Sequence, residues 1–246
     1  MDGGSADLYA TGNTNGSDVG TFAFGEVTID GRAISGGGAT ATLTLNDQST
    51  LAAGSMTVAH GTVYVDGRVN MTAASVMNVT LDGVIDGQGR STYAQLTGPG
   101  TPETSGCTWN TANYGNDKAA SHGGLGGSTS AECAYGSTFW PVTVGSGGKG
   151  GTGGAALRLE VSGELWLDGS IVMDASAASA HWSGGSGGSA WVTAGVLRGS
   201  GGSVSADGGE RNGDGDAGGG GGRIALYCTS SAYGSNDSAH GWALPA

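Results

Sequence analysis

Acidic side chains gather in one glycine-rich stretch of the chain, where they have the chemistry of a metal site. Four of them lie between positions 207 and 216: Asp207, Glu210, Asp214 and Asp216. Asn212, Asp214 and Asp216 have the alternate spacing of oxygen ligands for a hard cation, but an EF-hand loop starting there requires glycine and glutamate where this chain has Ala217 and Arg223. We expect a solvated turn and no cofactor. The alternative is a Ca²⁺ bound by Asp207, Asp214 and Asp216.

Catalytic groups are not evident in the sequence. Glycoside hydrolysis needs two facing carboxylates, whereas most aspartates here stand in Asp-Gly pairs typical of turns. The histidines form no metal-binding pair, and we expect all four to be polar loop residues: His60, His122, His181 and His240. We therefore expect no catalytic residues and no enzyme. A polysaccharide lyase or hydrolase is the enzymatic alternative.

The composition restricts the partners of the protein. The chain has 53 glycines among 246 residues, and its formal charge is −12 with only nine lysines and arginines. Phosphate binding depends on basic side chains, so nucleic acid is excluded as a partner. The sequence has no apolar run of transmembrane length, so we expect no membrane insertion. It also lacks a signal-peptide core at its start, which predicts a mature form or a piece of a longer chain.

Cysteines and glycosylation sequons indicate an extracellular or cell-surface protein. Cys107 and Cys133 bracket an irregular stretch, and we expect them to form a disulfide. Cys228 follows a strand-like run and is either a buried free thiol or an intermolecular partner. Four asparagines stand in N-x-[ST] sequons, which we expect to carry glycans: Asn15, Asn70, Asn78 and Asn236.

A short unit of alternating apolar residues followed by Asp-Gly recurs along the chain. Its copies are residues 27–31 (VTIDG), 63–67 (VYVDG), 79–83 (VTLDG) and 165–169 (LWLDG), with a variant at 43–47 (LTLND). Alternation predicts a strand with one buried face, and Asp-Gly predicts a corner where glycine takes a positive φ. The first corners follow one another at steps of 16 to 20 residues.

Strands and corners at a regular step predict a single-stranded parallel β-solenoid, or β-helix, in an all-β protein without helix. Antiparallel hairpins with type I′ turns are the alternative. We expect one domain over residues 1–246, with an N-terminal extension at about 1–22 and a C-terminal tail at about 229–246. A long irregular insertion is expected at about 98–152.

The glycine-rich segments resemble those of large cell-surface and secreted proteins of bacteria, algae and plants. The resemblance spans roughly residues 62–228 and depends on five segments: 121–124 (SHGG), 135–137 (YGS), 150–157 (GGTGGAAL), 184–191 (GGSGGSAW) and 219–225 (GGGGRIA). It implies an extracellular β-helical scaffold and no particular reaction.

Strand alternation also places Trp166, between Leu165 and Leu167, on the outward face of its strand. An outward tryptophan stacks on a sugar ring, packs on another subunit or is covered by a loop. We expect a glycosylated structural subunit of an extracellular fibre, which self-assembles head to tail into a homopolymer because solenoid ends are open strand edges. The alternative is a Ca²⁺-dependent, carbohydrate-binding adhesin module.

Overall fold

The computed structural model describes residues 20–31, 40–101, 107, 119–127, 133–179, 182–212 and 217–233. These residues form strands and no helix. The strands are β1 (Thr21–Ile29), β2 (Ala41–Leu45), β3 (Thr50–Val58), β4 (Gly61–Val65), β5 (Arg68–Val79), β6 (Gly83–Asp86), β7 (Ala156–Leu167), β8 (Ser170–Val172), β9 (Ser189–Gly199), β10 (Ser203–Ser205) and β11 (Arg223–Tyr233).

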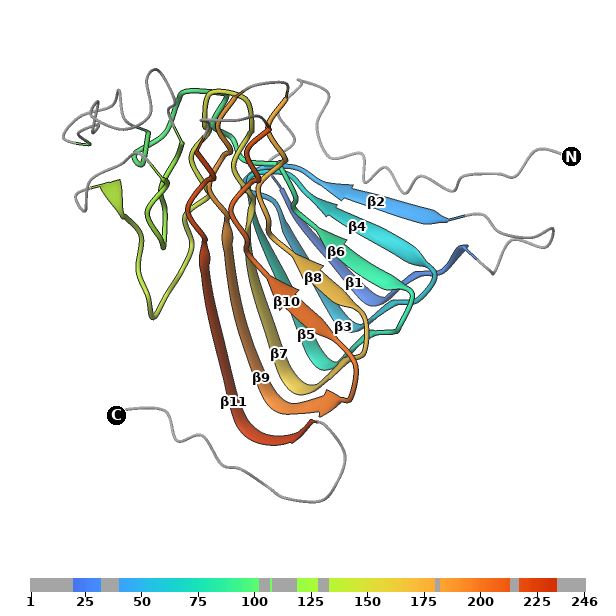
Figure 1. The fold of residues 1–246 in the computed structure, drawn as a ribbon. Helices are drawn as coiled ribbons and strands as arrows, with labels where there is room; N and C mark the ends of the chain where they lie inside the picture. Colours follow the sequence, from blue (N-terminus) through green and yellow to red (C-terminus); the bar gives the residue numbers. More distant parts are fainter. Residues whose placement is uncertain are drawn as a thin grey trace, which may run out of the picture.

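The strands form two parallel sheets, and the chain alternates between them (Figure 1). One sheet has six strands in the order β1-β3-β5-β7-β9-β11, and the other has five in the order β10-β8-β6-β4-β2. Every strand pair in the described residues is parallel. The predicted all-β parallel fold is therefore confirmed, and the hairpin alternative is wrong.

The core lies between the two sheets and is built from columns of apolar side chains in register. Met71 on β5 pairs with Leu159 on β7, which pairs with Val192 on β9, and all three are fully buried. Alternate residues face outward, as period-two strands require. The small sheet contributes similar rows of inward apolar side chains, in one of which Ile85 on β6 pairs with Ile171 on β8.

The distance in sequence between paired strands differs along the chain. Thr50 pairs with Asn70, 20 positions later, whereas Arg158 pairs with Trp191, 33 positions later, and Trp191 with Ala225, 34 positions later. The predicted step of 16 to 20 residues was counted between corners of two different kinds. Asp30 and Asp82 follow strands of the large sheet, while Asn46 and Asp66 follow strands of the small sheet.

The Asp-Gly corners depend on glycine for two different reasons. Gly67 has a φ of 67° and provides the predicted left-handed turn. Gly83 and Gly169 have no positive φ; a Cβ at Gly83 would overlap the Val58 carbonyl, and one at Gly169 the Gly83 carbonyl. At these two corners glycine is required for close backbone packing, so the expectation of a positive φ is wrong there.

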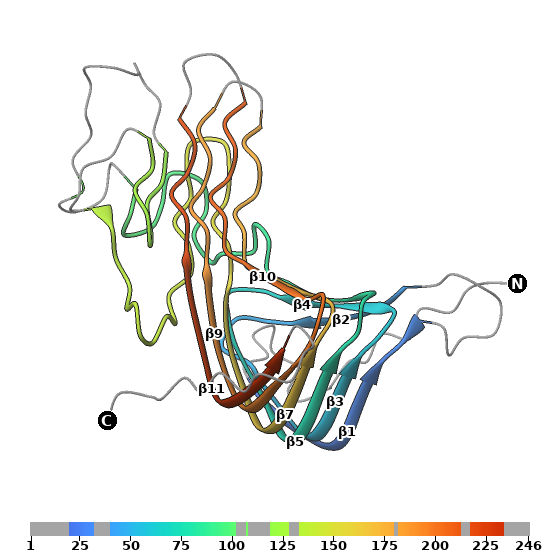
Figure 2. The same cartoon turned by 60° about the horizontal axis from the view of Figure 1, so that its bottom comes forward.

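The longer spacing in the second half of the chain comes from extended glycine-rich segments, which we call the glycine bundle. It consists of residues 119–127, 145–154, 183–188, 206–209 and 217–222. Backbone hydrogen bonds link its segments, such as Gly154 N–H to the Ser186 carbonyl, Gly187 N–H to the Gly220 carbonyl and Gly220 N–H to the Ala120 carbonyl. Figure 2 shows these segments running alongside one another, away from the two sheets.

The predicted insertion lies between β6 and β7, and its described residues contain no strand. Residues 145–152 of the predicted insertion belong to the glycine bundle. At the C-terminal end, β11 reaches Tyr233 and so extends into the segment predicted as a tail. The predicted N-terminal extension lies almost wholly outside the described residues.

Candidate functional site

Both ends of the two-sheet stack leave core positions uncovered. At one end, β11 pairs only with β9 within the described residues. Ile224 and Leu226 on β11 are in register with the fully buried Ala190 and Val192, yet they are 47% and 42% exposed. Their side chains occupy inward positions beyond which the described residues provide no further strand.

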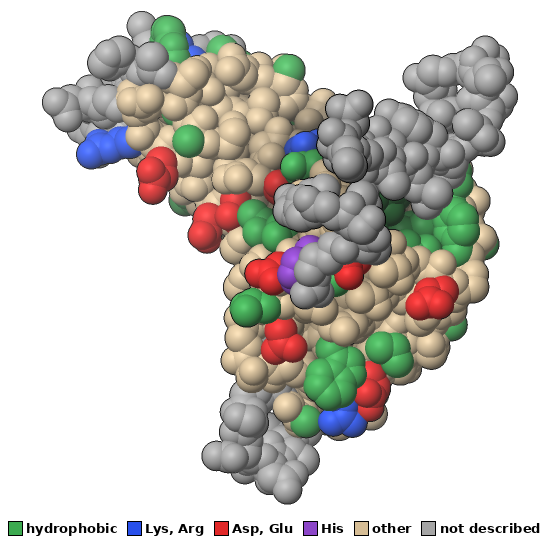
Figure 3. Space-filling view, turned by 90° about the vertical axis from the view of Figure 1, so that its right-hand side faces the viewer, with side chains coloured by type: hydrophobic (Ala, Val, Ile, Leu, Met, Phe, Trp, Pro, Cys, Tyr) green, Lys and Arg blue, Asp and Glu red, His purple; other side chains and the backbone are tan. Residues whose placement is uncertain are grey.

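At the opposite end of the stack, inward apolar positions on edge strand β1 are also uncovered. On β1, Phe22 and Phe24 are in register with the buried Leu51 and Ala53 of β3. Phe22 is partly buried against the core, and Phe24 is exposed. Figure 3, viewed from the side nearest β2 in Figure 1, shows apolar side chains at the surface among acidic ones, with few basic residues.

A strap formed by residues 133–143 crosses the outer face of the large sheet near β11. The Arg223 side chain donates from Nε to the Tyr135 carbonyl (2.9 Å) and from its guanidinium to Thr138 Oγ1 (3.0 Å), while the Tyr227 hydroxyl donates to the Phe139 carbonyl (2.9 Å). Trp140, next to Phe139, is strongly exposed. The strap therefore holds two neighbouring aromatic rings in contact with solvent.

The expected disulfide is confirmed and fixes the start of the strap. Cys107 and Cys133 are bonded, and both are buried. Cys228 is a free cysteine whose inward side chain is buried, and burial raises the pKa of its thiol. Of the two interpretations of Cys228, the structure favours the buried free thiol.

His122 anchors the strap to the glycine bundle. It lies in a segment without strand or helix, as expected for a polar loop residue, but its ring is fully buried. Nδ1 lies 2.7 Å from the Gly187 carbonyl, to which it must donate, and Nε2 therefore accepts from the Thr143 hydroxyl at 2.7 Å. Desolvation by burial lowers the pKa of His122 from 6.5 to about 4, so the ring is neutral at pH 7.

Tyr135 completes this polar cluster. Its ring lies 4.5 Å from that of His122, and its hydroxyl donates to the Val144 carbonyl at 2.7 Å. Burial raises the pKa of Tyr135 well above its usual range. His122 Nδ1 bonds a backbone carbonyl rather than a carboxylate, and the Thr143 and Ser146 hydroxyls that contact the cluster are hydrogen-bonded within it, so we interpret it as a structural anchor. The sequence SHGG at 121–124 carried no signal that this histidine would be buried.

The outward position predicted for Trp166 is confirmed. Its side chain is 41% exposed, between buried Leu165 and Leu167. The indole Nε1 donates to Glu164 (3.0 Å), and the Arg198 guanidinium, bonded to Glu164 at 2.7 Å, lies 5.4 Å from the ring centroid. The Arg198 hydrogen bond lowers the pKa of the Glu164 carboxyl. No loop of the described residues covers this tryptophan completely.

The candidate cation ligands are only partly described. Asp214 and Asp216 lie outside the described residues. The Asp207 backbone N–H donates to Asp174 Oδ1 at 2.7 Å. In the described ranges no three His, Cys, Asp or Glu side chains come together in a way that would hold a metal ion. The calcium site remains a prediction.

Two of the sequons can be placed. Asn70 and Asn78 both face outward on β5, and the Asn70 amide donates to Thr50 Oγ1 at 3.4 Å. Asn15 and Asn236 lie outside the described residues. Glycosylation therefore remains a prediction at all four asparagines.

The fold class supported by these observations is an all-β protein built on parallel sheets. Comparison of the chain with protein-family models, with curated proteins and with solved structures found no match. None of the described residues forms a helix long and apolar enough to cross a membrane.

Proposed function

We propose that this chain is a β-solenoid segment of an extracellular or cell-surface fibre and that its scaffold assembles by stacking end to end. The alternation of successive strands between two parallel sheets supports the solenoid. The observation on which the fibre proposal depends is that inward apolar positions are uncovered at both ends, at Ile224 and Leu226 and at Phe24.

The partner that best fits each end is the opposite end of a second copy. Edge strands β1 and β11 belong to the same parallel sheet and each has one unpaired side in the described structure, so β11 of one copy beside β1 of the next continues the sheet. In the register of the sheet, Phe22 lies in the same inward row as Leu226, and Phe24 lies in the row of Cys228, so each row would continue into the next copy. A contact between two different surfaces does not close on itself, so repeating it produces a filament.

Other features fit an extracellular location. The buried Cys107–Cys133 disulfide is typical of an oxidising compartment. The chain carries a charge of −12, which limits lateral association of exposed strand edges. The fibre requires no catalysis, and we propose that the protein is a structural glycoprotein rather than an enzyme.

Substituting charged residues at the open end tests this proposal. We expect Ile224→Asp combined with Leu226→Asp to abolish assembly of the purified chain, because each aspartate would be buried without a partner in the stack. Ser230→Lys on the same strand is the matched control, since Ser230 aligns with the outward row of Val196 and Glu164. Sedimentation velocity and negative-stain electron microscopy over a concentration series provide the measurement.

Filaments formed by the native chain and by Ser230→Lys, but not by the double variant, would support the proposal. A native chain that remains monomeric at every concentration would overturn the self-assembly, as would filaments formed equally well by the double variant. Circular dichroism of each variant establishes that the sheets are intact.

A further inference from the structure

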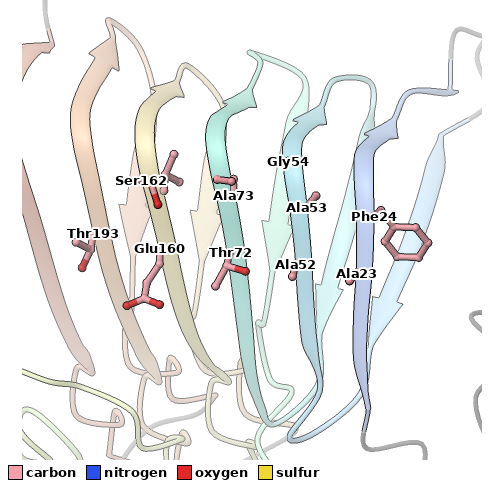
Figure 4. A pocket seen from close by; sticks show the side chains of 12 residues that line it. Ala23, Phe24, Ala52, Ala53, Gly54, Thr72, Ala73, Glu160, Ser162 and Thr193 are labelled. Atoms are coloured by element: carbon pink, nitrogen blue, oxygen red, sulfur yellow. The ribbon is translucent and has the colours of Figure 1, made fainter.

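A hollow of about 610 Å³ lies on the six-stranded sheet and spans β1, β3, β5, β7 and β9. One outward side chain from each strand lines it, and these five residues are neighbours in the strand register: Ala23, Ala52, Thr72, Glu160 and Thr193. Figure 4 shows the five side by side across the strands. With strands about 4.8 Å apart, the row is a track of about 19 Å.

The shape of the hollow suits an extended ligand rather than a compact one. The hollow is open to solvent, and small side chains line its β1 and β3 part, where Ala23 and Ala52 stand. Phe24 borders it at the β1 edge and projects beyond that strand in Figure 4. A linear molecule lying across the strands would contact every residue of the row.

The row combines hydroxyl groups with one fixed carboxylate. The hydroxyls of Thr72 and Thr193 make no hydrogen bond within the part of the chain that the structure describes. Glu160 accepts from the Arg158 guanidinium at 2.5 Å, and Arg158 lies 4.6 Å above the Trp191 ring. This stacking fixes the position of the arginine, which in turn orients the carboxylate.

This combination of groups matches a sugar chain. Alanine methyl groups pack against the apolar C–H faces of pyranose rings, while threonine hydroxyls and a carboxylate bond their hydroxyl edges. The charges at the site favour an uncharged polysaccharide. Arg158 is already paired with Glu160, and the protein carries a formal charge of −12, so polyuronates and polyphosphates are repelled. We propose that this outer-face hollow binds an extended, neutral polysaccharide without a metal ion.

The site lies on the outer face of the sheet and does not rest on the proposed fibre, although Phe24 of the open β1 end borders it. It also differs from a calcium-dependent site at the acidic loop, because Asp207 does not line the hollow. A fibre in which every subunit presents this row would bind polysaccharide along its length.

The test is affinity electrophoresis in native gels containing hydroxyethyl cellulose, galactomannan or mixed-linkage β-glucan, with polygalacturonate as the charged comparator. Ala52→Trp fills the hollow from its floor. Thr57→Trp is the matched control, because Thr57 is another outward position of β3, beyond the irregularity between Ala53 and Ser55 and away from the hollow. We expect at least one neutral gel to retard the native chain and Thr57→Trp, with binding by Ala52→Trp weaker by about tenfold or more.

Thr193→Trp, at the other end of the row, is a second blocking variant in case Ala52→Trp does not fold. Retardation unchanged by EDTA and lost in a folded blocking variant would establish the site. The proposal is overturned if no neutral polysaccharide retards the native chain, if only polygalacturonate does, if EDTA abolishes binding, or if the folded blocking variants bind like the native chain. Filament formation by Ala52→Trp is scored separately, because the stacking ends are intact in that variant.

Discussion

The two halves of the molecule share one core but return the chain from the small sheet to the large one in different ways. In the first half, a short turn makes this connection, and Asp47 Oδ1 accepts from the N–H of Arg68, the first residue of β5, at 2.7 Å. In the second half the same corner is expanded into the glycine bundle, where backbone groups bond to each other. The core therefore sets the register of the strands, and the length of this connection can vary without disturbing it.

The comparison also separates two sources of stability. At a short corner, a side-chain cap such as Asp47 holds the start of one neighbouring strand. In the glycine bundle the segments are so close that added atoms would overlap, since a Cβ at Gly188 would meet the Ala155 carbonyl and one at Gly220 the Gly124 carbonyl. The second half should therefore be the part of the chain more sensitive to substitution and to pH.

The largest expected effect is an acid-induced loss of stability in the second half, caused by His122. Its pKa is about 4 in the folded chain and 6.5 when unfolded, so the unfolded chain binds the proton more readily. The His122 contribution is fully present above pH 6.5, falls as the pH drops toward 4 and is lost below that value. The total is about 3 kcal/mol in the free energy of unfolding.

Chemical denaturation of the native chain and of His122→Gln between pH 7.5 and 4 measures this contribution. The variant should be less stable at pH 7.5, and the difference between the two proteins should shrink as the pH falls. Hydrogen exchange should show the loosening in residues 119–127 and the strap rather than in β1 to β5. A difference that is constant with pH would rule out titration of His122 as its cause.

An adjacent pair of glycines tests the glycine bundle itself. A Cβ at Gly219 would overlap the Gly185 carbonyl, whereas one at Gly218 has its nearest neighbour at 3.9 Å. We expect Gly219→Ala to lower the free energy of unfolding by about 2 kcal/mol through overpacking. Gly218→Ala should change it by less than about 0.5 kcal/mol. Urea titrations of the two variants provide the measurement, and equal effects would show that close packing does not hold the bundle together.

The sequence was sufficient to predict the features that depend on side-chain alternation. The alternation at 165–169 placed Trp166 outward, and the spacing of Cys107 and Cys133 around an irregular stretch predicted their disulfide; both are confirmed. The glycine bundle could not be predicted in the same way. Its segments contact one another through backbone atoms, which every residue has, so no side-chain pattern records which segments are neighbours.

The hollow and the buried histidine were missed for a related reason. Ala52 and Thr72 become neighbours of Glu160 only through the register of β3, β5 and β7, and β5 and β7 are separated by the whole insertion. His122 is buried because residues 187 and 143, far along the chain, supply its hydrogen-bond partners. Neither arrangement has a local sequence signature.

The smallest expected effect concerns the side-chain cap of the first half. Asp47→Ala removes the acceptor for the Arg68 N–H and the carboxylate that lies 3.6 Å from the Arg68 side chain. The Arg68 side chain is more than half exposed, so the ion pair itself contributes little. We expect a loss of about 1 kcal/mol in the free energy of unfolding, mainly from the backbone donor. Asp47→Asn is the matched control, because its amide oxygen can accept the same hydrogen bond, and it should retain most of the stability.

If Asp47→Asn is as unstable as Asp47→Ala, the charge rather than the cap is responsible, and the short corner is held electrostatically. If neither variant differs from the native chain, the core alone holds the strands of the first half together, and only the second half depends on the connections between its sheets.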